Sequence, residues 1–327
     1  MRKSTKLTPN LTIISSEDPG KIFQFCPIER GSNSHITRES RLTVRMNYAI
    51  NILDNNKVKI KKFSLKQEEL SFLLQDVLAQ SRVKHPNIIQ LYSIYHRENY
   101  AQLWLVEEDF GHCFYDIIRG NCPRSTQKWI DPRCSECYYF HREHDESDTD
   151  SIEENNSYFT SGTRLSEKSI SKIIKQVLLA LQLLHNEGKV HRNLHSKTIH
   201  INKESVVKID RFFHNSNEED EFDRKVILAN HPLPSYIAPE LLNPGCIYTS
   251  EIDLFSVGIF ILELLESTTP LVELDRSEIF STLSKNEITL PESASSCLKN
   301  FLGLVLCRKP SNRATIDVLL KHPFIVL

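Results

Sequence analysis

The segment VHRNLHSKTIHIN, residues 190–202, gathers several side chains that could take part in chemistry within one short stretch. It offers an imidazole at His191, a guanidinium at Arg192 and an amide at Asn193. An amide can hold a hydroxyl group by hydrogen bonds, but it cannot take up a proton near neutral pH. The segment can therefore orient a hydroxyl group, whereas Asn193 cannot serve as a general base.

The elements around this segment are short strands and long helices. TIHIN at 198–202 and SVVKID at 205–210 are typical of short strands. Before them, Ser166 predicts a helix N-cap, and the apolar residues that follow it recur at i, i+3, i+4 and i+7. This spacing predicts a long amphipathic helix. The run from Phe255 to Leu265 is apolar on all sides, which predicts a buried central helix.

The first 110 residues favour strands with one helix. NYAINILDNNKVKIKKF at 47–63 places Asp54, Asn55 and Asn56 between two alternating runs, which predicts a hairpin. Residues 65–85 contain leucine and valine at helical spacing, and YAQLWLVEEDF at 100–110 is typical of a buried strand that leads into a linker. The chain therefore changes from mainly strands to mainly helices near residue 110.

Composition excludes several classes of function. The 327 residues are 40% hydrophobic and 25% charged, with a formal net charge of −2, as in an ordinary globular protein. This charge gives no bulk attraction to nucleic acid or to an anionic membrane. No apolar run is long enough to span a bilayer. The eight cysteines are scattered, with no secretory signal before them, which favours reduced thiols and a cytoplasmic location.

Residues 121–162 read as an acidic, disordered insertion, because they hold too little apolar surface to offset the entropy of ordering. CSECYYFHREH within it has C-x2-C-x3-H-x2-H spacing, whose four members could bind zinc or could simply lie in a loop: Cys134, Cys137, His141 and His144. The acidic run at 143–154 could bind a basic partner or could be a solvated linker.

The chain resembles protein kinases over nearly its whole length. Five segments occur in the order and spacing of that family: HPNIIQLY at 85–92, VHRNL at 190–194, IAPELL at 237–242, EIDLFSVGIFILELL at 251–265 and KPSNRATIDVLLKHPF at 309–324. The resemblance implies an α+β, bilobal, protein-kinase-like fold. A small β-rich N-lobe with the hinge would occupy residues 1–110 and a mainly helical C-lobe residues 111–327, together forming one domain.

The resemblance also assigns structural roles to residues that match the family: His191, Arg192, Phe212, Glu240, Asp253, Gly258 and Arg313. Glu240 and Arg313 are expected to form a buried ion pair that anchors the activation segment. Asp253 is expected to hold the backbone of the loop that contains VHRNL. Gly258 would let helices pack closely, and Phe212 would fill one layer of the hydrophobic spine.

The positions that perform phosphoryl transfer in kinases carry different residues here. The resemblance places Asn193 at the catalytic Asp, His195 at the catalytic-loop Lys and Thr198 at the metal-binding Asn. Arg211 stands eighteen positions after Asn193, where kinases carry the metal-binding Asp, although a one-residue slip would place Asp210 there. A guanidinium repels Mg²⁺ but can neutralise phosphate charge. These residues imply that ATP binds without magnesium and that the chain is not an enzyme.

The nucleotide-binding positions are partly retained. VKIK contains Lys61, at the position of the lysine that binds phosphates, and Asp76 stands where its acidic helix partner belongs. Lys61 either binds phosphates or is only a strand lysine paired with Asp76. Glu107 occupies the gatekeeper position, where a charge costs desolvation, and Glu108 and Phe110 are hinge residues.

Within the kinases the chain is similar to STRAD, the sterile-20-related adaptor pseudokinases, through RLTV, KVKIKKFSL, LWLV and SEIDLFSVGIFILELLESTTPLVELDRSEI. This resemblance implies a catalytically inactive adaptor that binds and activates a partner serine/threonine kinase, together with a helical-repeat scaffold protein, in the cytoplasm and also the nucleus. Two alternatives stay open. One is a weakly active or atypical serine/threonine kinase that uses Lys61 and Asp210, and the other is a scaffold that acts through its insertion.

Overall fold

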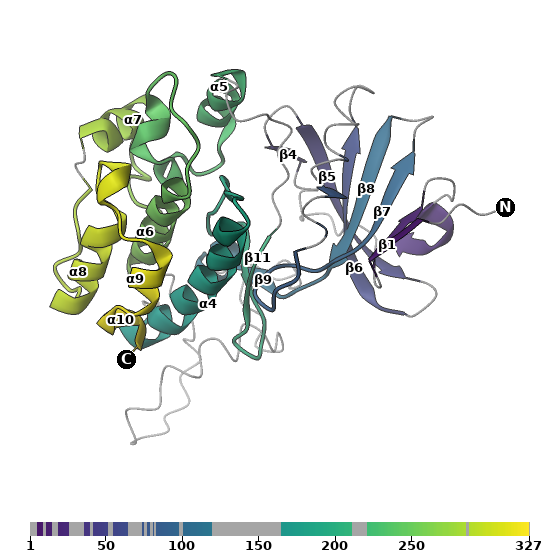
Figure 1. Cartoon of the computed structure of the whole chain (residues 1–327), viewed down its shortest axis with the longest axis horizontal. Helices are drawn as coiled ribbons and strands as arrows, with labels where there is room; N and C mark the ends of the chain where they lie inside the picture. Colours follow the sequence, from purple (N-terminus) through teal and green to yellow (C-terminus); the bar gives the residue numbers. More distant parts are fainter. Residues whose placement is uncertain are drawn as a thin grey trace, which may run out of the picture. The chain divides into compact units, whose positions relative to one another are not determined.

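The computed structural model describes residues 5–8, 11–14, 19–25, 36–39, 42–51, 55–64, 74, 77–78, 81, 83–97, 101–119, 165–210, 221–285 and 288–326. The chain forms two compact units, of which the first comprises residues 1–109 and 211–231 and the second residues 110–210 and 232–327. The first contains a large sheet and the second is mainly helical, as in the predicted bilobal α+β fold (Figure 1). None of the described helices has both the length and the hydropathy that a bilayer crossing requires.

The sheet of the first unit has the strand order β1-β2-β7-β8-β6-β5-β3, with β4 paired to β5. Its elements are β1 (Thr5–Thr8), β2 (Leu11–Ile14), η1 (Pro19–Lys21), β3 (Phe23–Phe25), β4 (Ile36–Glu39), β5 (Leu42–Asn51), β6 (Lys57–Ser64), β7 (Leu91–Arg97) and β8 (Gln102–Glu108). Neighbouring strands pair antiparallel, except that β2 runs parallel to β7. Helix α5 (Glu221–Asn230) contacts β4 in the same unit.

The hairpin predicted at residues 54–56 is confirmed, because β5 pairs antiparallel with β6 across it. Asn55 has a φ of +57°, in the left-handed region that asparagine tolerates better than most residues. The Asn51 N–H donates to the Asn56 carbonyl at 2.9 Å and closes the turn. Local chemistry therefore sets this turn and, with it, the register of β6 against β5.

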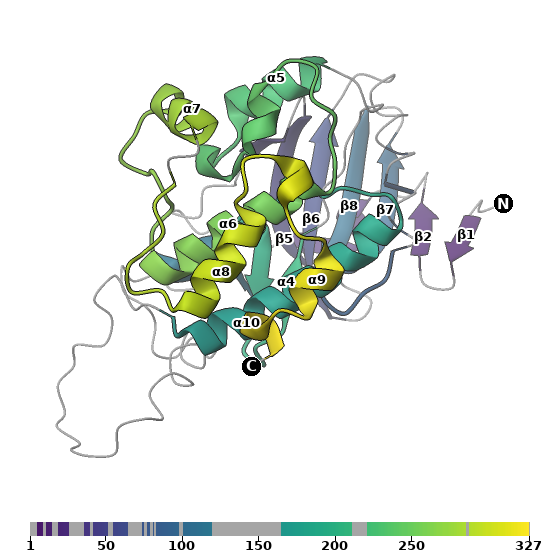
Figure 2. The ribbon, with the colours of Figure 1, turned by 60° about the vertical axis from the view of Figure 1, so that its left-hand side comes forward.

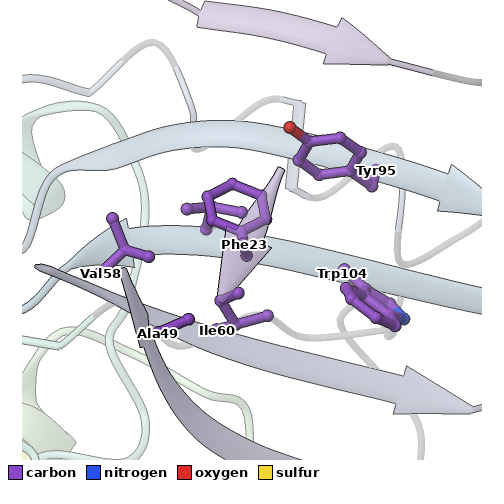
Figure 3. Packing of buried hydrophobic residues seen from close by; sticks show 7 residues of the cluster. Phe23, Ala49, Val58, Ile60, Tyr95 and Trp104 are labelled. Carbon is purple, nitrogen blue, oxygen red and sulfur yellow. The ribbon is translucent and has the colours of Figure 1, made fainter. Parts of the chain in front are cut away.

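Strand register gives the central sheet two different faces, of which one carries an apolar cluster and the other carries three buried charged residues among apolar ones. Figure 3 shows the apolar face, where Phe23 packs on a cluster completed by Ala49, Val58, Ile60, Tyr95, Trp104 and Val106. The Phe23 and Tyr95 rings meet edge to face, with centroids 5.8 Å apart. Because side chains alternate along a strand, Lys59 and Lys61 of β6 point to the opposite face from Val58 and Ile60. The same alternation places Glu107 of β8 opposite Lys59.

The second unit is built around two long helices, α4 (Glu167–Asn186) and α6 (Glu251–Glu266). The predicted N-cap is confirmed, because the Ser166 hydroxyl accepts from the Ser169 N–H at 3.2 Å. Residues 252–265 of α6 are all buried, as predicted for a central helix. Helices α8 (Ser296–Val305) and α9 (Ile316–Leu320) and the short α10 (Pro323–Val326) pack around these two (Figure 2).

A small sheet with the order β11-β10-β9 completes the second unit. Its strands are β9 (His112–Cys113), β10 (Ile199–Ile201) and β11 (Val207–Ile209), and β9 leads into α2 (Phe114–Ile118). Strand β11 contacts α4. The other described elements of this unit are η3 (Pro234–Tyr236), η4 (Pro239–Leu242), α7 (Arg276–Lys285) and η5 (Pro310–Asn312).

Some predictions are met only in part or fall outside the described residues. Residues 211–231 belong to the first unit, whereas the sequence reading assigned all of 111–327 to the second lobe. Within residues 65–85, where a helix was expected, the structure describes Leu74, Val77, Leu78 and Ser81, which are helical, and residues 83–85, which are not. The insertion 121–162, with the zinc candidates Cys134, Cys137, His141 and His144, lies outside the described residues.

Candidate active site

The loop that contains Asn193 is held by the carboxylate of Asp253, from the first turn of α6. One carboxylate oxygen accepts from the Arg192 N–H and the other from the His191 N–H, each at 2.8 Å. His185 Nε2 also lies 2.8 Å from the Asp253 carboxylate. Arg192 has a φ of +64°, so its backbone has a conformation that few residues with a side chain adopt. These hydrogen bonds stabilise the loop in that shape.

Asp253 keeps its charge although it is buried. Burial raises the pKa of its carboxyl group, but hydrogen bonds and the charges of His185 and His191 outweigh this effect, so the net pKa is lowered. A hydrogen bond that favours the ionised form is the usual cause of such a lowering. Asp253 is therefore ionised at neutral pH and accepts hydrogen bonds from the loop.

Thr198 stabilises the other end of the same loop by hydrogen bonds. Its hydroxyl lies 2.9 Å from the Asn193 carbonyl and 3.0 Å from the His195 carbonyl, and it accepts from the His195 N–H at 3.0 Å. The Thr198 hydroxyl is thus used within the loop. In contrast, no hydrogen bond joins the Asn193 side chain to another residue in the described part of the chain.

Asp210 follows β11 directly and is joined to this loop by its backbone. Its N–H donates to the Thr198 carbonyl at 2.7 Å, and its carbonyl accepts from His191 Nε2 at 2.8 Å. The Asp210 carboxylate lies 3.6 Å from His200 Nε2. Arg211 and Phe212 lie outside the described residues, so their proposed roles remain predictions.

His195 faces the interior of the second unit. Its side chain is buried, its Nδ1 accepts from the Lys197 N–H at 3.2 Å, and its ring meets the Tyr236 ring edge to face at 6.1 Å. Tyr236 in turn donates to Glu263 of α6, at 2.5 Å. Burial and the Glu263 charge raise the pKa of Tyr236 well above its ordinary value, so this hydroxyl stays protonated.

The ion pair between Glu240 and Arg313 is present. Arg313 donates to both carboxylate oxygens of Glu240, at 2.6 and 2.8 Å. Its remaining donors go to the carbonyls of Cys307 and Glu251, each at 2.9 Å. Gly258 of α6 lies against Leu306, which leaves no room for a side chain at that position.

In the first unit, Lys61 pairs with the gatekeeper Glu107. Lys61 Nζ lies 3.2 Å from the Glu107 carboxylate, and the two side chains are 2% and 0% exposed. Lys59 Nζ lies 4.0 Å from the same carboxylate. A charged gatekeeper was expected to cost desolvation, but here two ammonium groups lie beside it. Asp76 lies outside the described residues, so its pairing with Lys61 stays a prediction.

The two hinge residues have roles within their own units. Glu108 accepts from the Gln90 N–H at 3.1 Å and so joins β8 to the start of β7. Phe110 lies under the Lys208 ammonium, 4.5 Å from its ring centroid. Neither contact tests their predicted role in binding a nucleotide.

The residues present fit a nucleotide better than a metal held by the protein alone. Among the described residues, no group of three or more His, Cys, Asp or Glu could hold a metal ion. Magnesium, however, is commonly bound by one or two carboxylates together with substrate phosphates. Asp210 supplies one such carboxylate. In the first unit, Lys61 carries a positive charge of the kind that pairs with phosphate.

Two neighbours of site residues were not singled out by sequence reasoning, namely Lys59 beside Glu107 and His185 beside Asp253. For Lys59 a signal existed, because Lys59 and Lys61 are two residues apart in a predicted strand and so share a face. For His185 the signal was weak, because the helical pattern marks it only as part of a half-buried face of α4.

Comparison with known proteins identifies relatives of the chain. The family model described as "Protein kinase domain" matches residues 136–325. The chain is 26% identical to serine/threonine-protein kinase PAK 5 of Rattus norvegicus over 278 residues, which cover 83% of the chain and 32% of that protein. It is 26% identical to PAK 4 of Homo sapiens over 273 residues, covering 82% and 38%. Kinase CLA4 of Saccharomyces cerevisiae is 26% identical over 299 residues, covering 89% and 31%. The chain thus spans about a third of the length of these relatives.

These relatives correct one prediction. The substitutions at Asn193, His195, Thr198 and Arg211 led to the expectation that the chain is not an enzyme. That expectation is wrong, because the similar proteins are named serine/threonine-protein kinases. The same matches support the kinase family without bearing out the STRAD type.

Proposed function

Because the chain belongs to the protein kinase family, we propose that it is an atypical serine/threonine protein kinase that transfers phosphate slowly from ATP to a protein hydroxyl group. The observation that carries this proposal is the position of Asp210. Its backbone is hydrogen-bonded to Thr198 and to His191, so a carboxylate stands next to the loop that contains Asn193.

The chemistry of phosphoryl transfer tolerates a weak base. The transferred group passes through a loose transition state, so catalysis depends mainly on positioning and on electrostatic stabilisation. The amide of Asn193 can hold the attacking hydroxyl, although it cannot accept its proton. A general base contributes about 10²–10⁴-fold to a rate. We therefore expect turnover slower than that of ordinary kinases by a factor of this order.

Two charged groups would bind the nucleotide and its magnesium ion. Lys61 offers an ammonium to the nucleotide phosphates, and Asp210 offers a carboxylate to a magnesium ion that arrives with ATP. Bound magnesium would neutralise charge on the phosphate oxygens. Thr198, which stands where kinases carry a second metal ligand, is occupied within the loop and is not assigned to the metal.

A phosphotransfer assay with purified protein tests this proposal. Labelled ATP, magnesium and a generic serine- and threonine-containing protein would be combined with wild type, Lys61→Met, Asp210→Asn and the control Lys57→Met. Lys57 is exposed at the start of β6, so its replacement changes charge on the same strand without touching the proposed site. We expect slow transfer that is lost in the first two variants and retained in the control. Transfer that persists in Lys61→Met would not depend on Lys61, as would be the case for a contaminating kinase. This result would refute the proposal.

A further inference from the structure

Three charged side chains share one face of the first unit's sheet. Lys59 of β6 is the direct antiparallel partner of Glu107 of β8, and Lys61 stands two residues further along β6. Side chains at alternate positions point the same way, so register brings all three together. The Glu107 carboxylate lies 3.2 Å from Lys61 Nζ and 4.0 Å from Lys59 Nζ.

The three charged side chains are buried, so their mutual charges matter energetically. Lys61 and Glu107 are almost completely inaccessible, and Lys59 is 7% exposed at its side chain. A buried charge is costly unless a partner of opposite sign lies next to it. One carboxylate between two ammonium groups leaves a net charge of +1. These three groups by themselves therefore carry one more positive than negative charge.

We propose that Glu107 is the residue that positions Lys61 toward the phosphates of the nucleotide. The inference rests on the proposed function, which assigns Lys61 to those phosphates. Strands β6 and β8 are paired from Val58–Glu108 to Ser64–Gln102, so the sheet itself fixes the separation of Lys61 and Glu107. A partner carried by a paired strand holds the lysine without requiring the movement of a helix.

A competing role for Glu107 would be merely to offset the charge of Lys59. The distances argue against it, because the carboxylate is closer to Lys61 than to Lys59. The two roles also make different predictions for a variant in which both Lys59 and Glu107 are neutral. That variant keeps the net charge at +1 but deprives Lys61 of this carboxylate.

The experiment measures the affinities for ATP and for adenosine by calorimetry in five proteins. These are wild type, Lys59→Met, Glu107→Gln, Glu107→Asp and the double variant Lys59→Met/Glu107→Gln. Adenosine lacks phosphates, so its affinity should change little if Glu107 acts through Lys61. Because Lys61 would lose the carboxylate that lies 3.2 Å from its ammonium group, we expect ATP affinity to fall about tenfold in Glu107→Gln and in the double variant. Lys59→Met should stay near wild type, and Glu107→Asp should lie between wild type and the double variant.

Each outcome of this experiment either supports or overturns the inference about Glu107. If the double variant binds ATP as wild type does, Glu107 only offsets Lys59 and the inference is wrong. Equal losses for ATP and adenosine would indicate a general structural defect and would also overturn it. Should Glu107→Gln not fold, the double variant and Glu107→Asp carry the test, because both keep the charge of the cluster. If the ATP affinity depends on Glu107 as expected but the wild-type protein transfers no phosphate, the proposed function is refuted and this inference still stands.

Discussion

Arg313 donates to both carboxylate oxygens of Glu240, and this pair joins two segments that are far apart in the chain. Glu240 lies in η4 and Arg313 directly follows η5. The Arg313 side chain is fully buried, and the Glu240 side chain is 13% exposed. Since Arg313 also donates to two backbone carbonyls, it fixes the start of α6 and the end of α8 against the η4 segment.

Replacement of Glu240 by alanine should therefore leave a buried guanidinium without its charge partner. We expect a loss of about 3–5 kcal/mol in the free energy of unfolding, measured by urea denaturation. The matched control is Lys189→Ala, which breaks an ion pair with Glu187 whose side chains are 29% and 40% exposed. Such a surface pair contributes less than about 1 kcal/mol. Similar losses in the two variants would mean that burial of the Glu240–Arg313 pair has no energetic consequence.

Two glycines in helices should respond to alanine in opposite directions. A Cβ at Gly258 of α6 would lie 2.5 Å from Leu306 Cδ2 and 2.7 Å from Leu306 Cγ, so Gly258→Ala should destabilise by about 1–3 kcal/mol through overpacking. A Cβ at Gly303 of α8 meets no atom within 4 Å. Gly303→Ala should therefore stabilise by about 0.5–1 kcal/mol, because alanine has the higher helix propensity. Thermal unfolding of both variants checks this, and a stabilised Gly258→Ala would contradict it.

The lowered pKa of Asp253 predicts the direction of an acid effect on stability. A carboxyl group whose pKa is lower in the folded than in the unfolded protein stabilises the fold above the unfolded pKa, and this stabilisation is lost as the pH falls through the folded pKa. Asp253→Asn lacks this contribution. The difference in unfolding free energy between wild type and Asp253→Asn should be largest above about pH 4 and should narrow below it. Urea unfolding at a series of pH values measures the difference, and a gap that widens towards low pH would show that the sign is wrong.

Restoring a base at position 193 should accelerate phosphate transfer. Asn193→Asp changes an amide to a carboxylate of nearly the same shape, in a loop that Asp253 and Thr198 already hold. A general base contributes about 10²–10⁴-fold, so we expect a clear increase in kcat with little change in the KM for ATP. Asn193→Ala is the control and should be slower than wild type. An unchanged rate in Asn193→Asp would show that proton transfer does not limit the reaction.

The role of Asp210 can be separated from that of Arg211 by a thermal shift with ATP. If Asp210 holds magnesium together with the phosphates, ATP should stabilise the protein more in Mg²⁺ than in EDTA, and Asp210→Asn should remove this difference. Equal stabilisation in both buffers would instead support Arg211 as the group that neutralises phosphate charge. Arg211→Ala, measured in EDTA, distinguishes that case.

Local signals in the sequence were sufficient for several elements, and the ordered motifs for the fold class. The cap at Ser166, the turn at Asn55 and the apolar run within α6 each depend on neighbouring residues, and the structure confirms them. The ordered motifs indicated the kinase fold, and the family match bears this out. The prediction of an inactive protein from a few substituted catalytic positions went further than the residues allowed. Residue types at a few positions do not determine the rate of phosphate transfer.

The tertiary structure decided which charges meet. Sequence spacing suggested Asp76 as the partner of Lys61, which stays a prediction, and the pairing of β6 with β8 brings the Glu107 carboxylate to 3.2 Å from Lys61, which sequence spacing did not suggest. Likewise, the sequence marked Asp253 as the residue that holds the loop, but only the packing of α4 against α6 brings His185 to its carboxylate. Such contacts depend on strand register and helix packing between segments distant in the chain, and no local pattern specifies them.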